Sequence, residues 1–205
     1  MVPVTDLSAL REQVADWKRQ GLRVGFVPTM GNLHDGHFAL LELAKSRCER
    51  VVSSIFVNPT QFGPNEDFEA YPRRTEADSA KLEAAGVDLL WMPSVDEVYP
   101  EGFATHIRIA DLPDQLCGAA RPGHFDGVAT VVAKLFGMTL ADRAYFGEKD
   151  WQQLQVVRRL EEITLRSGNL TGAHHYLRRL VELDDLDEAR WRAAGAAAIQ
   201  ATGRS

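Results

Sequence analysis

The apolar residues of this chain follow two alternating periods over roughly its first 160 positions. Helical spacing, or a helix start or stop signal, marks five stretches: 7–17, 40–48, 75–85, 126–136 and a helix from about residue 150. Short β-branched and aromatic runs mark the predicted strands: 23–27, 51–57, 87–91, 144–146 and a short edge strand at 105–109. This alternation predicts parallel β-α-β units. We therefore expect an α/β fold, a Rossmann-like doubly wound parallel sheet with right-handed crossovers and helices on both faces.

Two local signals refine the helix boundaries. Gly21 follows the first predicted helix as a stop residue. Thr75 and Asp78 stand three positions apart, which is typical of a capping box at a helix start. We therefore expect the third helix to begin at Thr75 and to end near Ala85, before Gly86.

The pattern changes after about Glu162. The following residues contain two segments rich in Ala, Leu and Arg at helical spacing, 173–183 and 186–201. We expect residues 1–160 to form a Rossmann-like ligand-binding domain and residues 161–205 to form a short, mainly helical C-terminal segment. A segment of roughly 40 residues is too small for a typical independent domain.

Charge and cysteine content narrow the function classes. The 205 residues carry 29 acidic and 23 basic side chains, a net charge of −6, so we expect no electrostatic binding to nucleic acid. Cys48 and Cys117 fit neither a disulfide framework nor a zinc spacing, which indicates a reducing compartment. No apolar run reaches the ~20 residues of a membrane helix, and residues 1–6 lack a signal-peptide pattern. These features predict a cytoplasmic protein that acts on a small molecule or on a protein partner.

The strongest chemical signal is His34-Asp-Gly-His37, which follows the first predicted strand. The start of the next helix would offer backbone N–H groups and a positive dipole end to phosphate. Two imidazoles there could neutralise charge on an α-phosphate during nucleotidyl transfer. The alternative is a helix cap with two solvated histidines, because short motifs carry false positives. A zinc site is less favoured, since no third ligand is evident nearby.

Three further polar turns follow predicted strands or precede predicted helices: Asn58-Pro-Thr-Gln-Phe62, Arg121-Pro-Gly-His-Phe-Asp-Gly127 and Phe146-Gly-Glu-Lys-Asp-Trp-Gln-Gln153. Asn58 and Gln61 could hold hydroxyl and carboxylate groups of a small polar substrate at the carboxyl edge of the sheet. Arg121 and His124 are anion-binding candidates, and Lys149 is suited to phosphate.

Each of these turns also has a structural explanation. Amides can cap loop backbone, valines at the spacing of Val128, Val131 and Val132 are usually core, and Asp150 can be a helix N-cap. Their common position at one kind of sheet edge nevertheless favours a shared ligand site.

Five co-linear stretches of the chain resemble the pantothenate synthetase (pantoate–β-alanine ligase) family. They are Pro28-Thr-Met-Gly-Asn-Leu-His-Asp-Gly-His37, Ser54-Ile-Phe-Val-Asn-Pro-Thr-Gln-Phe62, Tyr71-Pro-Arg73, Arg121-Pro-Gly-His-Phe125 and Phe146-Gly-Glu-Lys-Asp-Trp-Gln-Gln-Leu154. The resemblance covers about residues 1–160 and implies the nucleotidyltransferase fold related to class I aminoacyl-tRNA synthetases. It also implies a two-step reaction: pantoate and ATP give pantoyl adenylate and pyrophosphate, and β-alanine then displaces AMP to give pantothenate.

The resemblance further implies a role for individual residues. The ATP site would contain Met30, Gly31, His34, His37, Gly147, Glu148, Lys149 and Asp150. Its catalytic groups would be His34, Lys149 and His37, the last as proton donor. The pantoate pocket would contain Asn58, Gln61, Val131, Val132 and Gln153, with Gln61 also contacting β-alanine. Mg²⁺ would arrive with ATP without dedicated protein ligands, Asp78 being at most a weak outer ligand, and the assembly would be a homodimer.

The chain departs from the family pattern after Leu160. Family members continue with another strand, a Ser-Ser-Arg-Asn loop over the ATP phosphates and a lid domain, whereas residues 161–169 follow a different pattern. Loss of an internal block, omission of residues from the sequence and a divergent replacement would each explain this.

Three functions therefore stay open. The first is the ligase, or its nucleotide-binding core. The second is a catalytically impaired nucleotide- or pantoate-binding protein without a complete lid, which would contact partners through His174-His175 and Arg190-Trp-Arg192. The third is another nucleotidyltransferase with a different acceptor. Binding without turnover separates the first two, and the choice of acceptor separates the third.

Overall fold

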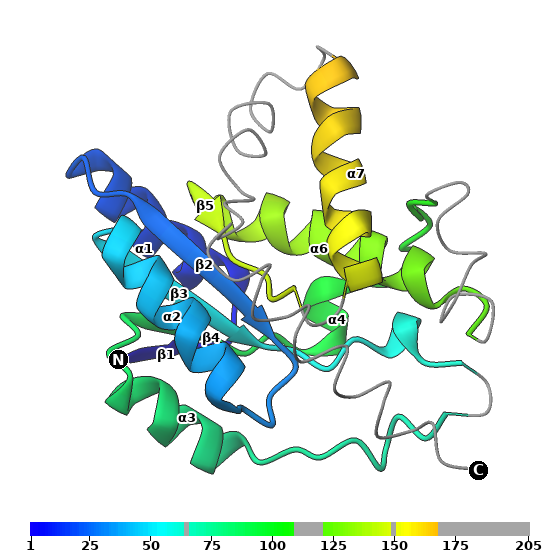
Figure 1. Ribbon diagram of the computed structural model, residues 1–205, viewed down its shortest axis with the longest axis horizontal. Coiled ribbons are helices and arrows are strands. Elements are labelled where there is room, and N and C mark those ends of the chain that lie inside the picture. Colours follow the sequence, from blue (N-terminus) through cyan, green and yellow to red (C-terminus); the bar gives the residue numbers. More distant parts are fainter. Residues whose placement is uncertain (64–65, 109–120, 149–150, 168–205) are drawn as a thin grey trace, which may run out of the picture.

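The computed structural model describes residues 1–63, 66–108, 121–148 and 151–167 of the chain. Within these ranges an all-parallel sheet has the strand order β1-β4-β3-β2-β5 (Figure 1). The strands are β1 (Val2–Val4), β2 (Val24–Thr29), β3 (Arg50–Ile55), β4 (Leu89–Trp91) and β5 (Arg143–Ala144). The predicted doubly wound parallel sheet is confirmed.

Helices cover both faces of the sheet. The helices are α1 (Leu7–Arg19), α2 (Asp35–Arg47), α3 (Thr75–Ala84), α4 (Val95–Val98), α6 (His124–Thr139) and α7 (Trp151–Ser167), with a 3-10 turn η1 (Pro59–Gln61). Helices α2 and α3 share one buried cluster, and α1, α4, α6 and α7 share another. The chain crosses the sheet in one direction from β2 to β4 and in the other direction from β1 to β2 and from β4 to β5. Because such crossovers are right-handed, the reversal places α1 and α6 opposite α2 and α3.

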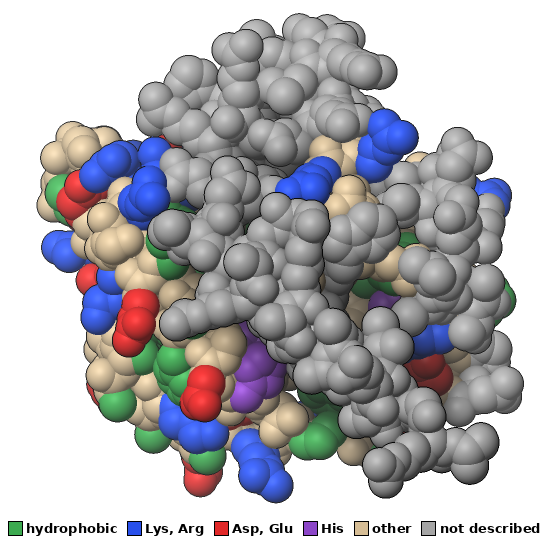
Figure 2. All heavy atoms as spheres, in the orientation of Figure 1, with side chains coloured by type: hydrophobic (Ala, Val, Ile, Leu, Met, Phe, Trp, Pro, Cys, Tyr) green, Lys and Arg blue, Asp and Glu red, His purple; other side chains and the backbone are tan. Residues whose placement is uncertain are grey.

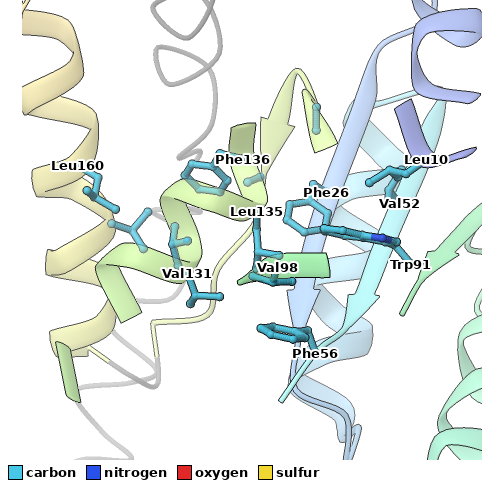
Figure 3. Close-up of a cluster of buried hydrophobic side chains, with 14 of the residues drawn as sticks. Leu10, Phe26, Val52, Phe56, Trp91, Val98, Val131, Leu135, Phe136 and Leu160 are labelled. Atoms are coloured by element: carbon cyan, nitrogen blue, oxygen red, sulfur yellow. The ribbon is translucent and has the colours of Figure 1, made fainter. Parts of the chain in front are cut away.

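The larger core lies between the sheet and helices α1 and α6 (Figure 3). Phe26, Val52 and Trp91 come from three neighbouring strands and have no exposed surface. They pack against Leu10 of α1 and Leu135 of α6. Burying a side chain of this size contributes about 1.5–3 kcal/mol to the stability of the fold, so the middle of the sheet is a stable support for the loops at the strand ends.

The structure corrects two local predictions. Residues 105–108 of the predicted edge strand are not a strand, because Ile107 N–H donates to Thr130 Oγ1 on α6 (3.0 Å). The predicted capping box is also wrong. Arg74 is the N-cap of α3 without a side-chain bond, and the Asp78 carboxylate instead binds the loop after β2.

Some elements were not predicted, and some predictions lie outside the described ranges. β1 and α4 are additions to the predicted elements, and both are short. Helix α7 runs through the predicted boundary at residues 160 and 161, and the division into two segments stays a prediction. The predicted helices 173–183 and 186–201 lie outside the described residues. Among the helices of the described ranges, none has the length and apolar content that crossing a membrane requires.

Candidate active site

A cavity of about 340 Å³ lies at the carboxyl ends of β2 and β3. Here the strand order reverses, since β2 leads to β3 on one side and pairs with β5 on the other. Open α/β sheets bind ligands at this point. The lining includes these predicted site residues: Met30, Gly31, His34, His37, Asn58, Gln61, Val131, Val132 and Gln153. Side chains from four separate segments therefore meet in one cavity, and their individual roles stay predictions.

Other predicted residues lie elsewhere. Gly147 and Glu148 follow β5 at the same edge of the sheet but do not line this cavity. Lys149 and Asp150 lie outside the described residues. The lining also includes Phe56, which the prediction missed. The alternation along β3 was a usable signal, because Phe56 shares a strand face with the buried Val52.

The two motif histidines form a reciprocal cap at the start of α2. His34 is the N-cap residue, and its Nδ1 accepts a hydrogen bond from the Gly36 N–H (3.1 Å). His37 Nδ1 accepts from the His34 N–H (3.3 Å), and the ring centroids are 4.1 Å apart. Because each Nδ1 is an acceptor, a neutral ring carries its proton on Nε2. The alternative prediction of a helix cap is thus correct as geometry. The cap is compatible with ligand binding, because it occupies Nδ1 of each ring and leaves the Nε2–H as the donor. Histidine side chains are visible at the surface in the face shown in Figure 2.

The loop before α2 is held by a buried carboxylate. Gly31 and Asn32 have left-handed φ values of 83° and 53°. Asp78, 1% exposed, accepts hydrogen bonds from the N–H groups of Asn32 (2.7 Å) and Leu33 (3.2 Å). Carboxylate hydrogen bonds of this kind are stronger than neutral ones. Asp78 therefore fixes the loop that carries His34.

The second polar group of the cavity comes from the turn after β3. Asn58 is 1% exposed, and its Nδ2 donates to Gln61 Oε1 (3.1 Å) and to the Gly127 carbonyl (3.3 Å). Gln61 Nε2 lies 2.8 Å from Met30 Sδ. The turn η1 is thereby tied to α6 on one side and to the loop after β2 on the other.

A charged cluster supports the same turn from outside the cavity. Arg121 donates from Nη2 to Glu66 Oε2 (2.7 Å), and His124 Nδ1–H donates to the Gln61 carbonyl (2.7 Å). The Arg121 guanidinium, with the Gly63 N–H, lowers the pKa of Glu66 to about 2. Arg121 and His124 were predicted as anion-binding candidates. In the structure Arg121 binds Glu66 and His124 binds the backbone of Gln61, and a role in anion binding stays a prediction.

The described residues do not form a metal site. Within these ranges no group of three or more His, Cys, Asp or Glu side chains could hold a metal ion. The carboxylate of Asp78 is directed at two backbone N–H groups and lies 4.0 Å from the Lys81 ammonium, which accounts for its burial without a metal ion. A dedicated magnesium cage therefore does not fit the described part of the chain.

The fold and the site define a doubly wound α/β protein with a ligand cavity at its topological switch point. A family model described as pantoate-beta-alanine ligase matches residues 3–170, and the chain belongs to this family. The resemblance drawn from the five sequence stretches is confirmed.

Curated relatives of the chain are described as pantothenate synthetases. The chain is 58% identical over 174 residues to a pantothenate synthetase of Novosphingobium aromaticivorans, covering 85% of this chain and 59% of the relative. It is 60% identical over 159 residues to that of Xanthomonas campestris pv. campestris strain B100, covering 77% and 56%.

Two solved structures share the fold. The pantothenate synthetase of Thermus thermophilus has a TM-score of 0.74 and 54% identity, covering 80% of this chain and 58% of that chain. The pantoate-beta-alanine ligase of Francisella tularensis, complexed with beta-gamma ATP and beta-alanine, has a TM-score of 0.75 and 39% identity, covering 80% and 62%. The chain thus spans less than two thirds of the length of the relatives that it matches.

Proposed function

We propose that this chain binds ATP and pantoate at the 340 Å³ cavity and serves the AMP-forming ligation of pantoate to β-alanine. The observation that carries the proposal is the meeting of the His34–His37 cap with the Gln61 amide at the switch point. The family match over residues 3–170 supports the same substrates. The Francisella relative, described as complexed with beta-gamma ATP and beta-alanine, supports both ligands.

The first step joins pantoate to AMP. A pantoate carboxylate oxygen attacks the α-phosphorus of ATP, and the bond from that phosphorus to the pyrophosphate oxygen breaks. Negative charge builds up on the phosphate oxygens at the start of α2. The Nε2–H groups of His34 and His37 are suited to stabilise it, since each ring is held by a backbone bond at Nδ1.

The second step forms the amide. The β-alanine amine attacks the pantoyl carbonyl carbon, the bond from that carbon to the phosphate oxygen breaks, and AMP leaves as the amine loses a proton. Gln61, Gln153 and the valine wall of α6 would orient the reactants. Val131 and Val132 suit the methyl groups of pantoate, and the amides suit its hydroxyl groups. This task is mainly positioning.

Magnesium bound to the ATP phosphates would neutralise part of their charge. The described residues offer it no dedicated site, so it would arrive with the nucleotide. Lys149 and Asp150 as nucleotide ligands, a homodimeric assembly and a cytoplasmic location remain part of the proposal.

A second candidate is binding without turnover. The chain supplies 58% and 62% of the length of the two solved relatives, so ligand binding and ligation need separate measurement. The test measures ATP and pantoate binding by calorimetry, and AMP and pantothenate formation with ATP, magnesium, pantoate and β-alanine. Formation of both products supports the ligase. Binding of both substrates without AMP supports the second candidate, and binding of neither substrate contradicts the proposal.

A matched pair of cap variants tests the histidine role. His34→Asn keeps a residue type that caps helices well but removes the imidazole donor, so we expect the rate of AMP formation to fall about 10²–10³-fold. Asp6→Asn likewise installs an asparagine at an N-cap, that of α1, where Asp6 accepts from the Ala9 N–H, and we expect no change in rate. Equal rates of AMP formation for wild type and His34→Asn would show that His34 takes no part in the reaction.

A further inference from the structure

We propose that Tyr99 is a positioning residue for pantoate: its hydroxyl fixes the Asn58 amide, which turns the amide NH₂ of Gln61 into the cavity. The inference rests on the proposed function only in taking pantoate as the ligand of this cavity. Tyr99 does not itself line the cavity. It acts through Asn58, 41 positions away in the sequence.

The amide orientation of Asn58 follows from its neighbours. Its Oδ1 accepts from three donors: Tyr99 Oη (2.8 Å), Thr60 Oγ1 (2.9 Å) and Thr60 N–H (3.3 Å). Its Nδ2 faces two oxygen acceptors, Gln61 Oε1 and the Gly127 carbonyl. A flipped amide would set its NH₂ group against the Thr60 N–H, which can only donate, and its oxygen against the Gly127 carbonyl, which can only accept. Only one orientation satisfies this buried group.

The orientation of Asn58 determines what Gln61 offers to a ligand. Because Gln61 Oε1 accepts from Asn58, its NH₂ group is directed to the Met30 sulfur, 2.8 Å away. A thioether is a weak acceptor, and a hydroxyl or carboxylate oxygen of a ligand is a stronger one. The cavity is thus prepared for a ligand oxygen at Gln61, with Tyr99 at the start of the hydrogen-bond chain.

Tyr99 is itself firmly held. Its ring packs edge-on against Phe103, with centroids 5.0 Å apart, and the Lys134 ammonium lies 5.5 Å from its ring centroid. Burial raises the pKa of Tyr99, so the hydroxyl keeps its proton and remains a donor. The Thr60 hydroxyl, 3.2 Å from Tyr99 Oη, converges on the same oxygen of Asn58.

The test deletes one hydroxyl group at a time in the full chain. Tyr99→Phe keeps the ring packing and removes the donor, and we expect pantoate to bind about five- to tenfold more weakly in calorimetry. ATP affinity should not change, because the chain from Tyr99 ends at the Met30 sulfur, a weak acceptor, and does not reach His34 or His37. If the chain turns over, KM for pantoate should rise without a change in KM for ATP.

The matched control is Tyr145→Phe. Tyr145 is a buried tyrosine, whereas Tyr99 is partly buried. The Tyr145 hydroxyl lies 3.4 Å from Cys48 Sγ in the cluster on the other face of the sheet. Pantoate affinity should equal that of wild type in this control. Unchanged pantoate affinity in Tyr99→Phe, or equal weakening of pantoate and ATP, overturns the inference. If wild type binds ATP but no pantoate, the proposed function itself fails and the inference falls with it.

Discussion

The two ends of the parallel sheet use different side chains to accept backbone N–H groups. At the amino ends of the strands, carboxylates do so: Glu49 accepts from Arg23 N–H, Asp88 from Val51 N–H and Asp142 from Val24 N–H, all within 2.9 Å. Each carboxylate also pairs with a cation, in the pairs Arg23–Glu49, Arg50–Asp88 and Lys18–Asp142, within 3.4 Å. This end is closed by groups that neutralise one another.

At the carboxyl ends of the strands, two imidazoles and an amide accept some of the backbone N–H groups. His34 and His37 accept backbone N–H groups at Nδ1, and Asn58 accepts the Thr60 N–H at Oδ1. Unlike a carboxylate, each of these side chains has one atom that accepts and a different nitrogen that can donate at the same time. The same structural task therefore leaves hydrogen-bond donors beside the cavity at this end.

The comparison shows that polar side chains at a sheet edge are not in themselves a sign of function. What distinguishes the carboxyl end is the choice of side chains that carry both an acceptor and a donor. Asp78 is the exception there, because it is a carboxylate that accepts two backbone N–H groups and lies 4.0 Å from the Lys81 ammonium. In the structure it supports the loop that carries His34.

The largest expected effect comes from Gly127, near the start of α6 and beside the turn η1. A Cβ on Gly127 would lie 2.7 Å from the Thr60 carbonyl carbon and 2.9 Å from Gln61 Cα, which are backbone atoms. We expect Gly127→Ala to lower the free energy of unfolding by about 1–3 kcal/mol and to weaken pantoate binding more than tenfold. Urea denaturation and calorimetry measure the two effects.

Gly137→Ala is the control on the same helix. A Cβ there meets no atom within 4 Å, so the higher helix propensity of alanine should add about 0.5–1 kcal/mol of stability. Pantoate affinity should stay that of wild type. An equal loss of pantoate affinity in Gly127→Ala and Gly137→Ala would mean that contact between η1 and α6 does not shape the site.

The next largest effect is a loss of stability on changing an aspartate that accepts backbone N–H groups, and two such aspartates can be compared. Asp78→Asn places an NH₂ group against one of the two N–H groups in the loop before α2, which should cost about 1–3 kcal/mol of stability. Asp88→Asn keeps an oxygen for Val51 N–H and loses a partly exposed pairing with Arg50, which should cost less than about 1 kcal/mol.

Ligand binding separates the two aspartates further. Asp78→Asn should weaken ATP binding severalfold, because the loop it fixes carries His34, while Asp88→Asn should leave ATP affinity unchanged. Calorimetric titration with ATP decides this. A normal ATP affinity in Asp78→Asn would show that the histidine cap holds the loop without Asp78.

Much of the fold was predictable because its signals are local. The apolar periods and the stop at Gly21 mark elements that short windows of sequence determine. The carboxyl-edge site followed from strand ends, because parallel strands bring their ends to one edge. The prediction of an edge strand failed over residues 105–108, where Ile107 N–H donates to Thr130, which lies 23 positions later.

The supports of the site were not predictable in the same way. Asp78 binds a loop 45 and 46 positions away, and Arg121 binds Glu66 across 55 positions. Nothing in the local pattern distinguishes Asp78 from a capping residue of its own helix. Such contacts depend on which side chains the folded elements bring together, and spacing along the chain does not record this.

The smallest effect concerns two glutamates with equally lowered pKa values at opposite ends of the sheet. Arg121 lowers the pKa of Glu66, and Arg23 lowers that of Glu49, each from 4.5 to about 2. A lowered folded pKa stabilises the fold fully above pH 4.5, and this contribution is lost as the pH falls towards 2. The stability lost on Glu66→Gln or Glu49→Gln should therefore shrink between about pH 5 and about pH 3, as urea midpoints measure.

Pantoate affinity at neutral pH should distinguish the two glutamate variants, although their acid stability is alike. Glu66 holds Arg121 beside His124, which donates to the Gln61 carbonyl, so Glu66→Gln should weaken pantoate binding severalfold. Glu49 pairs with Arg23 at the amino end, so Glu49→Gln should bind pantoate like wild type. Equal pantoate affinity in the two variants would mean that the Arg121 cluster, like the ion pairs at the amino end, serves stability alone.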